Sequence, residues 1–309
     1  MHLRLSGYQG ASSVHTRGLH HLARRLSAAG SEVEIVEDVT ASGATAKALF
    51  EHVEQEEAHI CYMASGYLTT RVPSLAVLDL PLTVSDRLRA HRALDEEAGR
   101  LLAEDVERMT GLHVLGFWDN GMRHISNRSR PIRSVEDCSG LVIRTLDNQL
   151  YQNTLAAFGF KPVVTDVRDL VKAVASGAVD AQENPLTNTL NFGLHEHHRF
   201  LSMTGHIFGV ALLICRASWF RSLPDQEASA LTSAARAATL AQRGFAIEED
   251  QTALSRLRAQ GVQVVERQDL DMRSFEAAAA PLISNVLATI DEHLALAYLG
   301  ESRVLSVPE

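Results

Sequence analysis

The segment that follows Pro224 constrains the fold of this chain more than any other feature. Proline is favoured at a helix start, and Gly261 fits a helix stop. Between them runs an apolar stripe made of Leu231, Ala235, Leu240, Ile247, Leu254 and Leu257. The pattern predicts one helix of about 35 residues, or about 50 Å at 1.5 Å per residue. A single domain cannot bury such a helix along its whole length, so we expect it to brace two domains.

The length of the chain agrees with two domains, because 309 residues exceed the usual size of one. The sequence contains neither an internal repeat nor a Gly-, Pro- or Ser-rich linker between halves. We therefore expect the chain to cross between domains more than once. We expect lobe one to comprise residues 1–122 and 211–250, and lobe two to comprise residues 123–210 and 251–309, with a ligand cleft between them.

The first 64 residues predict a parallel sheet, because strand patterns alternate with helix patterns. The expected strands are 2–7, 32–36 and 60–64, and the expected helices are 14–29 and 44–57. Ligands of such sheets bind at the carboxyl ends of the strands. The corresponding loops here are 7–10, 38–43 and 65–70.

The middle of the chain repeats this rhythm and predicts a second β/α unit, so the fold class is α/β. We expect helix 85–109, strand 112–118 ended by a turn at 119–121, extended residues 123–127, strand 141–144, helix 148–158, strand 162–164, helix 168–176 and strand 179–181. After the long helix we expect a strand at 262–265 and a closing helix at 274–299.

The charge balance excludes nucleic acid as the main partner. There are 29 Lys and Arg against 38 Asp and Glu, which gives a net charge of −9, whereas phosphate contacts need clustered basic side chains. The only lysines are Lys47, Lys161 and Lys172, so nearly all positive charge is arginine. The planar arginine fork suits recognition of carboxylates.

The ends of the chain and the cysteines say little about the compartment. No apolar run approaches the roughly 20 residues of a membrane helix, and the start, MHLRLSGYQGASS, lacks the features of a signal peptide. On these residues, either the protein is cytoplasmic or its leader peptide is absent from this chain. Cys61, Cys138 and Cys215 form no CxxC pair, and we expect them to be buried thiols.

Motifs for cofactors and catalysis are missing from the sequence. It contains no GxG, no GxxxxGK[ST], no GxSxG and no HExxH. The densest metal-like cluster is His195, His197 and His198. Because this segment is polar, we interpret it as a solvated helix end rather than a zinc site. We therefore expect no metal and no cofactor, and a protein that captures a ligand rather than transforms it.

Two arginines stand at the ends of predicted strands. Arg123 lies in GMRHISN, and Arg144 ends the apolar strand LVIR. Both would project towards a crevice between domains, where an arginine can hold a carboxylate with two parallel hydrogen bonds. The alternative is a structural ion pair.

The sequence resembles a known family, the substrate-binding proteins of TRAP (tripartite ATP-independent periplasmic) transporters. The resemblance covers almost the whole chain and rests on the order of several segments. They are DLPLTV (79–84), GMRHISNRSRPI (121–132), SVEDCSGLVIRT (134–145), ASGAVDAQENPL (175–186), HHRFLSMTGHIF (197–208) and WFRSLPDQE (219–227).

The resemblance implies a two-lobed clamshell with a long helix shared by both lobes. It implies a monomeric protein, not an enzyme, that binds a small organic acid and delivers it to integral-membrane permease subunits. Such a protein works outside the inner membrane, typically in the periplasm.

The resemblance also assigns roles to single residues. Arg144 matches the carboxylate-binding arginine of the family, Arg123 matches a second arginine that helps to hold the acid, and Asn184 matches a residue that hydrogen-bonds the ligand. Further ligand-binding candidates are Tyr8 and Ser12 in the first-strand loop, Ser65 and Tyr67 in the third-strand loop, and Trp118 and Phe208 as pocket wall or plain core.

The chain departs from the family pattern at one helix. Asp169, Leu170 and Val171 replace the usual Glu-Val-Tyr, and Val167 replaces a bulkier residue. These changes should alter the pocket floor.

Two other classes of protein stay open on the residues alone. One is an α/β enzyme, a hydrolase or lyase of a small organic acid, that uses His206 or His124 with a nearby carboxylate. The other is a sensory ligand-binding module with the same fold.

Overall fold

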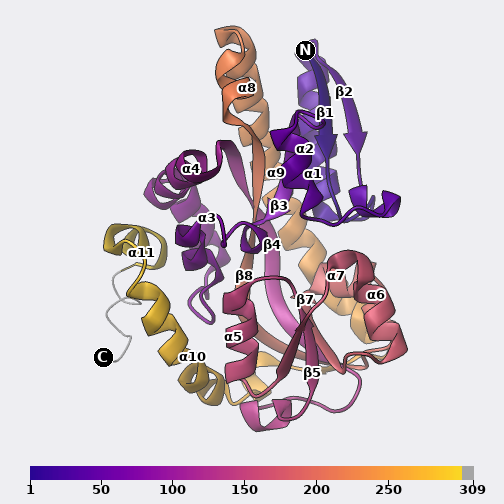
Figure 1. Cartoon of the computed structure of the whole chain (residues 1–309). Helices are drawn as coiled ribbons and strands as arrows, with labels where there is room; N and C mark the ends of the chain where they lie inside the picture. Colours follow the sequence, from indigo (N-terminus) through magenta and orange to yellow (C-terminus); the bar gives the residue numbers. More distant parts are fainter. Residues whose placement is uncertain (301–309) are drawn as a thin grey trace.

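The computed structural model describes residues 1–300 and has a two-lobed α/β architecture (Figure 1). The strands are β1 His2–Ser6, β2 Glu32–Val36, β3 Ile60–Ala64, β4 Leu112–Asn127, β5 Val142–Thr145, β6 Lys161–Val164, β7 Ala181–Pro185, β8 Phe200–Arg216 and β9 Gln263–Val265. The α-helices are α1 Val14–Ala28, α2 Ala48–Glu54, α3 Arg87–Asp95, α4 Glu97–Thr110, α5 Gln149–Ala157, α6 Val167–Ser176, α7 Leu186–Asn191, α8 Ala217–Ser222, α9 Asp225–Ala259, α10 Met272–Leu287 and α11 Glu292–Leu299.

One sheet runs through both lobes in the order β2-β1-β3-β8-β4-β7-β5-β6, with β9 beside β8. The expected parallel pairs are confirmed, since β1 pairs with β2 and β3, and β5 pairs with β6 and β7. The long strands β4 and β8 are antiparallel along almost their whole length. They connect the two groups of parallel strands, so the cavity described below lies where β4 passes from one lobe to the other.

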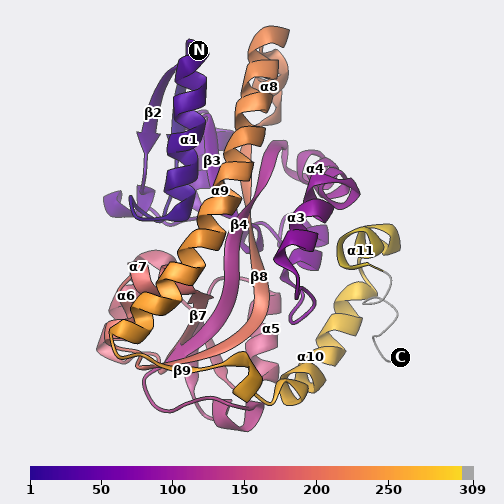
Figure 2. The ribbon, with the colours of Figure 1, turned by 180° about the vertical axis from the view of Figure 1, so that it is seen from behind.

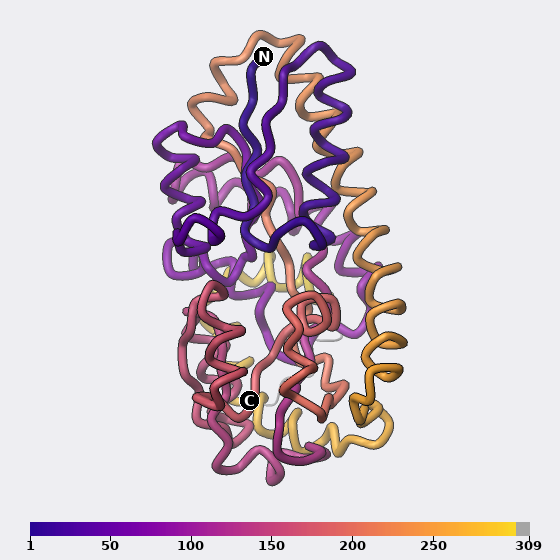
Figure 3. The backbone as a smooth tube through the Cα atoms, turned by 90° about the vertical axis from the view of Figure 1, so that its right-hand side faces the viewer, coloured from indigo at the N-terminus to yellow at the C-terminus, as the bar shows by residue number. Residues whose placement is uncertain are grey.

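The prediction of a long bracing helix is confirmed by α9, which has 35 residues. Its first half buries Leu231 and Ala235 in the core that contains β1 and β3. Its second half packs Ala253 and Leu257 against α7 and β8. Figure 2 shows α9 running along both lobes, and the side view in Figure 3 shows the same helix beside the upper and lower halves of the chain. Each half of the helix therefore contributes to a different core.

The expected turn at 119–121 is wrong. β4 continues through these residues, and its pairing with β8 shifts between Asp119 and Gly121, so that Asn120 is an extra, unpaired residue in the strand. Gly121 has a φ of +82°, a conformation that glycine adopts at no steric cost. The glycine that suggested a turn belongs instead to a β-bulge. A bulge and a turn can both require a residue with positive φ, so the glycine alone does not distinguish between them.

Two expected helices are each divided in the structure. Residues 85–109 form α3 and α4, which are separated by the extended backbone of Glu96. The closing segment 274–299 forms α10 and α11, and the side chain of Asp291 caps the start of α11. The apolar periodicity continues across both breaks, so periodicity alone did not reveal them.

The lobe ranges expected from the sequence stay a prediction. α11 belongs to the range expected for lobe two, yet it packs against α3 and α4, which belong to the range expected for lobe one. The last residues of that range, 301–309, lie outside the described part.

The three cysteines are free and buried, as expected. Within residues 1–300, none of the helices combines the length and the apolar character that a membrane span requires.

Candidate functional site

A small cavity lies where the two groups of parallel strands meet. Its volume is ≈ 30 Å³, and its lining comes from Tyr8, Gln9, Ala64, Tyr67, Asn120, Arg123, Arg144, Leu146, Tyr151, Val167, Asn184 and Asn188. Two of the three expected strand-end loops contribute to it, the loops after β1 and β3. The loop at 38–43 does not line it. A space of this size holds about one water molecule, so a larger ligand requires the walls to move apart.

The structure brings Arg144, Arg123, Asn184, Tyr67 and Tyr8 together around this cavity, although they are far apart in the sequence. Arg123 and Asn184 lie on the neighbouring strands β4 and β7, and Arg144 lies on β5, which pairs with the other side of β7.

The remaining candidates lie elsewhere. Ser65 is buried, and its hydroxyl donates to Asp79 Oδ1 at 3.5 Å. Ser12 is exposed, and its carbonyl accepts a hydrogen bond from Asn191. Trp118 packs in the core beside Tyr62 and donates to Thr239.

Phe208 is also a core residue, and its ring packs beside that of His91. Of the two interpretations of Trp118 and Phe208, the structure favours core for both. An aromatic side chain in the sequence predicts burial. Because residues of a pocket wall and of a core are both buried, the residue type alone did not distinguish the two interpretations.

Arg123 already has an internal anion. Its guanidinium donates to both carboxylate oxygens of Glu183, at 2.9 Å from Nη2 to Oε1, and lies over the ring of Tyr151. Nη2 also donates to Asn184 Oδ1 at 3.4 Å. Because the arginine is 4% exposed and the glutamate 0%, this is a buried ion pair. The charge of Arg123 is therefore largely balanced within the protein.

The charge of Glu183 is stabilised by its surroundings. Burial by itself raises the pKa of this carboxyl, but Arg123 and His206 outweigh that effect and lower the pKa to about 2. Thr145 also donates to Glu183 Oε1 at 3.0 Å. The carboxylate is thus ionised at neutral pH.

Arg144 differs from Arg123. Its Nε and Nη2 both donate to the carbonyl oxygen of Thr165, at 2.9 and 2.6 Å. Within the described residues, no carboxylate forms an ion pair with it, although only 2% of the residue is exposed. Burial holds the pKa of Arg144 below its ordinary value. Since an isolated buried charge is costly, this guanidinium is the strongest candidate to receive an anion in the cavity.

Sequence reasoning missed several polar residues of the lining, namely Gln9, Asn120, Tyr151 and Asn188. Gln9 lies within the expected first-strand loop at 7–10, so its position in the sequence is a signal for its place in the lining. Asn120 was assigned to a turn and Tyr151 to a helix, and Asn188 lies outside the elements expected from the sequence. Local periodicity shows which residues share a face of a helix, but it does not show which part of the protein that face contacts.

A hydrogen-bond network next to the cavity connects α5 with the segment after β3. Asp79, which is completely buried, accepts from Tyr151 at 3.3 Å and from Asn148 at 3.2 Å. Asn148 also donates to the carbonyl of Gly66 at 3.0 Å. Burial raises the pKa of Asp79 to about 7, against the effect of its hydrogen bonds. Its protonation state therefore changes near neutral pH.

Of the departures from the family pattern, Val167 alone lines the cavity. Leu170 packs in a separate apolar cluster with Val174, while Asp169 and Val171 are exposed on α6. Of the expected changes to the pocket floor, only the one at Val167 concerns a residue of this lining.

The histidines give no metal site in the part of the chain that is described, where no three potential metal ligands come together. The expectation of a solvated segment at 195–198 is wrong for His195 and His198, which are buried, and His198 pairs with Ser126 at 3.1 Å. His124 and His206, the residues of the enzyme alternative, do not line the cavity. His206 instead pairs with Thr204 at 2.8 Å, behind the ion pair of Arg123.

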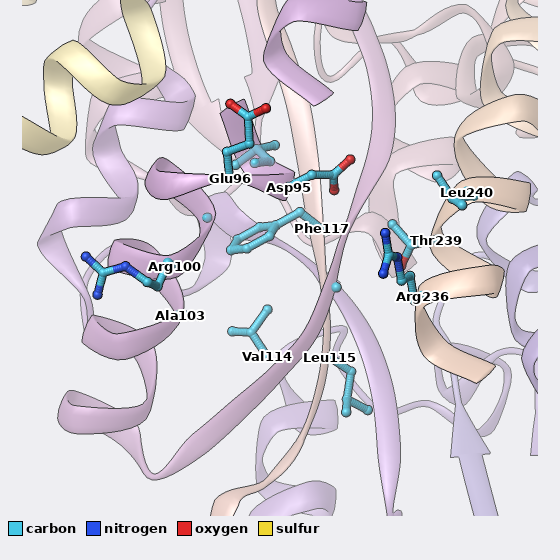
Figure 4. Close-up of a pocket in the computed structure, with 13 residues that line it drawn as sticks. Asp95, Glu96, Arg100, Ala103, Val114, Leu115, Phe117, Arg236, Thr239 and Leu240 are labelled. Carbon is cyan, nitrogen blue, oxygen red and sulfur yellow. The ribbon is translucent and has the colours of Figure 1, made fainter. Parts of the chain in front are cut away.

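A larger hollow of ≈ 500 Å³ lies on the outer side of lobe one, between α4, β4 and α9 (Figure 4). Its charged residues include Arg100, which pairs with Glu97 and Glu104, and Asp95, which pairs with Arg243. The other two charged residues of the lining, Glu96 and Arg236, have opposite charges, so the hollow offers a ligand no net charge. The smaller cavity at Arg144 is therefore the better candidate site.

The family model for bacterial extracellular solute-binding proteins, family 7, matches residues 5–289. A solute-binding protein from Verminephrobacter eiseniae is 30% identical over 223 residues, which are 72% of this chain and 66% of the relative. The 2,3-diketo-L-gulonate-binding periplasmic protein of Escherichia coli is 30% identical over 206 residues, 67% of this chain and 62% of that protein. The matched part thus spans just under two thirds of the length of these relatives.

The fold also matches solved structures. A TRAP periplasmic solute-binding protein from Polaromonas sp. JS666, bound to D-erythronate, is 25% identical, with a TM-score of 0.90 over 97% of this chain and 98% of that chain. The family is one of solute-binding proteins rather than enzymes. Because the family model covers nearly the whole chain and the two-lobed fold agrees, the chain belongs to the bacterial extracellular solute-binding proteins of family 7, as its TRAP-type motifs predicted.

Proposed function

We propose that this protein captures a small organic carboxylate in the cavity at Arg144 and delivers it to a TRAP-type membrane permease. The observation that carries the proposal is Arg144 itself, a buried guanidinium without a carboxylate partner among residues 1–300. A ligand carboxylate would supply the missing anion, and the exclusion of water would strengthen the pair. The similar protein from Polaromonas has D-erythronate bound, and the relative from Escherichia coli is named for binding 2,3-diketo-L-gulonate. Both of these ligands are carboxylates.

Binding would proceed by closure of the two lobes. Several hydrogen bonds join the segments expected for lobe one to those expected for lobe two, such as Arg168 to the carbonyl of Gly43 at 2.9 Å and Asn191 to that of Ser12 at 3.2 Å. In our proposal these contacts break when the lobes separate, and the acid enters between them. The protein acts as a monomer in the periplasm, or its extracytoplasmic equivalent, where it meets the permease subunits.

The experiment is titration calorimetry with a panel of organic acids on the wild type, Arg144→Ala and Arg236→Ala. Arg236 is an exposed arginine of the outer hollow and serves as the matched control. We expect Arg144→Ala to weaken the affinity for the bound acid by a factor of hundreds or more, and Arg236→Ala to leave it unchanged. A melting curve of the free Arg144→Ala protein checks that it is folded, because the substitution also removes the hydrogen bonds to the carbonyl of Thr165. Equal dissociation constants for wild type and Arg144→Ala would contradict the proposal.

A further inference from the structure

The charges around the cavity favour a ligand with a single negative charge. In the described part of the chain, the lining has two charged side chains, Arg123 and Arg144. Glu183 pairs with Arg123 and cancels one of them, so the net charge that faces a ligand is that of Arg144. The carboxylate of Asp166, whose charge also acts on Arg144, would repel a second carboxylate of the ligand.

A hydrogen-bond acceptor faces the same space. The amide oxygen of Asn120 is buried and has no hydrogen-bond partner within residues 1–300, and the residue as a whole is 6% exposed. A buried polar atom without a partner is unfavourable, because it has lost its hydrogen bonds to water and gained none in the protein. A hydroxyl group on a ligand would satisfy it, whereas a methylene group would leave it unpaired.

The β-bulge fixes the position of Asn120. Asn120 is the extra residue between the pairs of Asp119 with Val210 and of Gly121 with Gly209. Gln242 of α9 accepts from the backbone N–H of Asp119 at 2.8 Å and donates to its carbonyl at 2.7 Å. Gly209 leaves room for the asparagine, since a Cβ there would lie 3.2 Å from Asn120 Cβ. Bulges redirect side chains in this way next to binding sites.

From these observations we infer that the ligand is a hydroxylated monocarboxylate, whose carboxylate pairs with Arg144 and whose hydroxyl donates to Asn120. This inference rests on the proposed function, because it takes the cavity at Arg144 as the binding site. Other polar groups of the lining, including the amides of Gln9 and Asn188, would meet further hydroxyls. A site built for a hydroxyl discriminates strongly against an analogue that lacks it.

The test compares three acids of equal length by calorimetry at pH 7.5. At four carbons these are erythronate (2,3,4-trihydroxybutanoate), butanoate and succinate, and at six carbons they are gluconate, hexanoate and adipate. The proteins are the wild type, Asn120→Ala, Arg144→Ala and Asn153→Ala, where Asn153 is an exposed asparagine of α5 and the matched control. A melting curve of each variant checks that it is folded.

We expect the hydroxylated monocarboxylate of one length to bind the wild type at least tenfold more tightly than the plain acid and the diacid of that length. Asn120→Ala should remove most of this preference while Asn153→Ala keeps it. Tighter binding of a diacid or a plain acid, or an unchanged preference in Asn120→Ala, would overturn the inference and leave the proposed function intact. Acid binding that survives in Arg144→Ala, or no binding of any acid to the wild type, would overturn both.

Discussion

Glu183 accepts hydrogen bonds from the guanidinium of Arg123 through both of its carboxylate oxygens, in a pair that is almost completely buried. This pair makes the two cavity arginines unequal. Arg123 brings its own anion from β7, whereas Arg144 on β5 has a backbone carbonyl as its acceptor. The sequence predicted both as ligand-binding residues, and the structure gives the unbalanced charge to one of them.

The first prediction concerns this ion pair. Glu183→Gln should lower the free energy of unfolding by about 3–5 kcal/mol, because Arg123 becomes an uncompensated buried charge. The double variant Arg123→Met/Glu183→Gln should be more stable than Glu183→Gln alone. Urea denaturation of the wild type, both single variants and the double variant measures the coupling. Purely additive effects would show that the pair does not interact as described.

The second prediction concerns pH. Burial raises the pKa of Asp79 from 3.8 to about 7, so the folded protein binds a proton here that the unfolded chain has already released. Its contribution to stability is complete below about pH 4 and is lost as the pH rises to about 7. The loss is on the order of 4 kcal/mol, since each unit of pKa difference corresponds to about 1.4 kcal/mol.

The variant Asp79→Asn carries no titrating group at this position. Between pH 4 and pH 8, its melting temperature should therefore fall less than that of the wild type, and differential scanning calorimetry at fixed ionic strength measures both slopes. Parallel curves for the two proteins would mean that Asp79 keeps the same pKa in the folded and unfolded states.

The third prediction concerns the bulge. Gly121 has a φ of +82°, and a Cβ there would lie 2.9 Å from Pro185 Cβ. Gly121→Ala should therefore lower the free energy of unfolding by about 1–3 kcal/mol, since an alanine is strained in this conformation and must also displace the proline. Thermal and urea unfolding measure the change.

Gly244 provides a control of opposite sign. It lies in α9, and a Cβ there would meet no atom within 4 Å. Gly244→Ala should stabilise the protein by up to about 1 kcal/mol, because alanine is the better helix former. A Gly121→Ala protein as stable as the wild type would show that the strand does not need the left-handed residue.

The sequence by itself determined the features that depend on neighbouring residues. The alternation of strands and helices placed β1, β2 and β3 almost to the residue, and the apolar stripe with Pro224 and Gly261 at its ends gave α9. The motifs at Arg123 and Arg144 also placed both arginines at the cavity. These features follow from local periodicity, capping and short motifs, which are all visible along the chain.

Only the tertiary structure decided which positive charge of the site is balanced by a carboxylate of the protein. Whether Arg123 or Arg144 keeps a free charge depends on the register of β4 and β7, which places Arg123 next to Glu183 from 60 residues away. The bulge that directs Asn120 into the cavity is fixed by its pairing with β8 and by Gln242 of α9. Strand pairing and side-chain burial join residues that are distant in the sequence, so no local pattern encodes them.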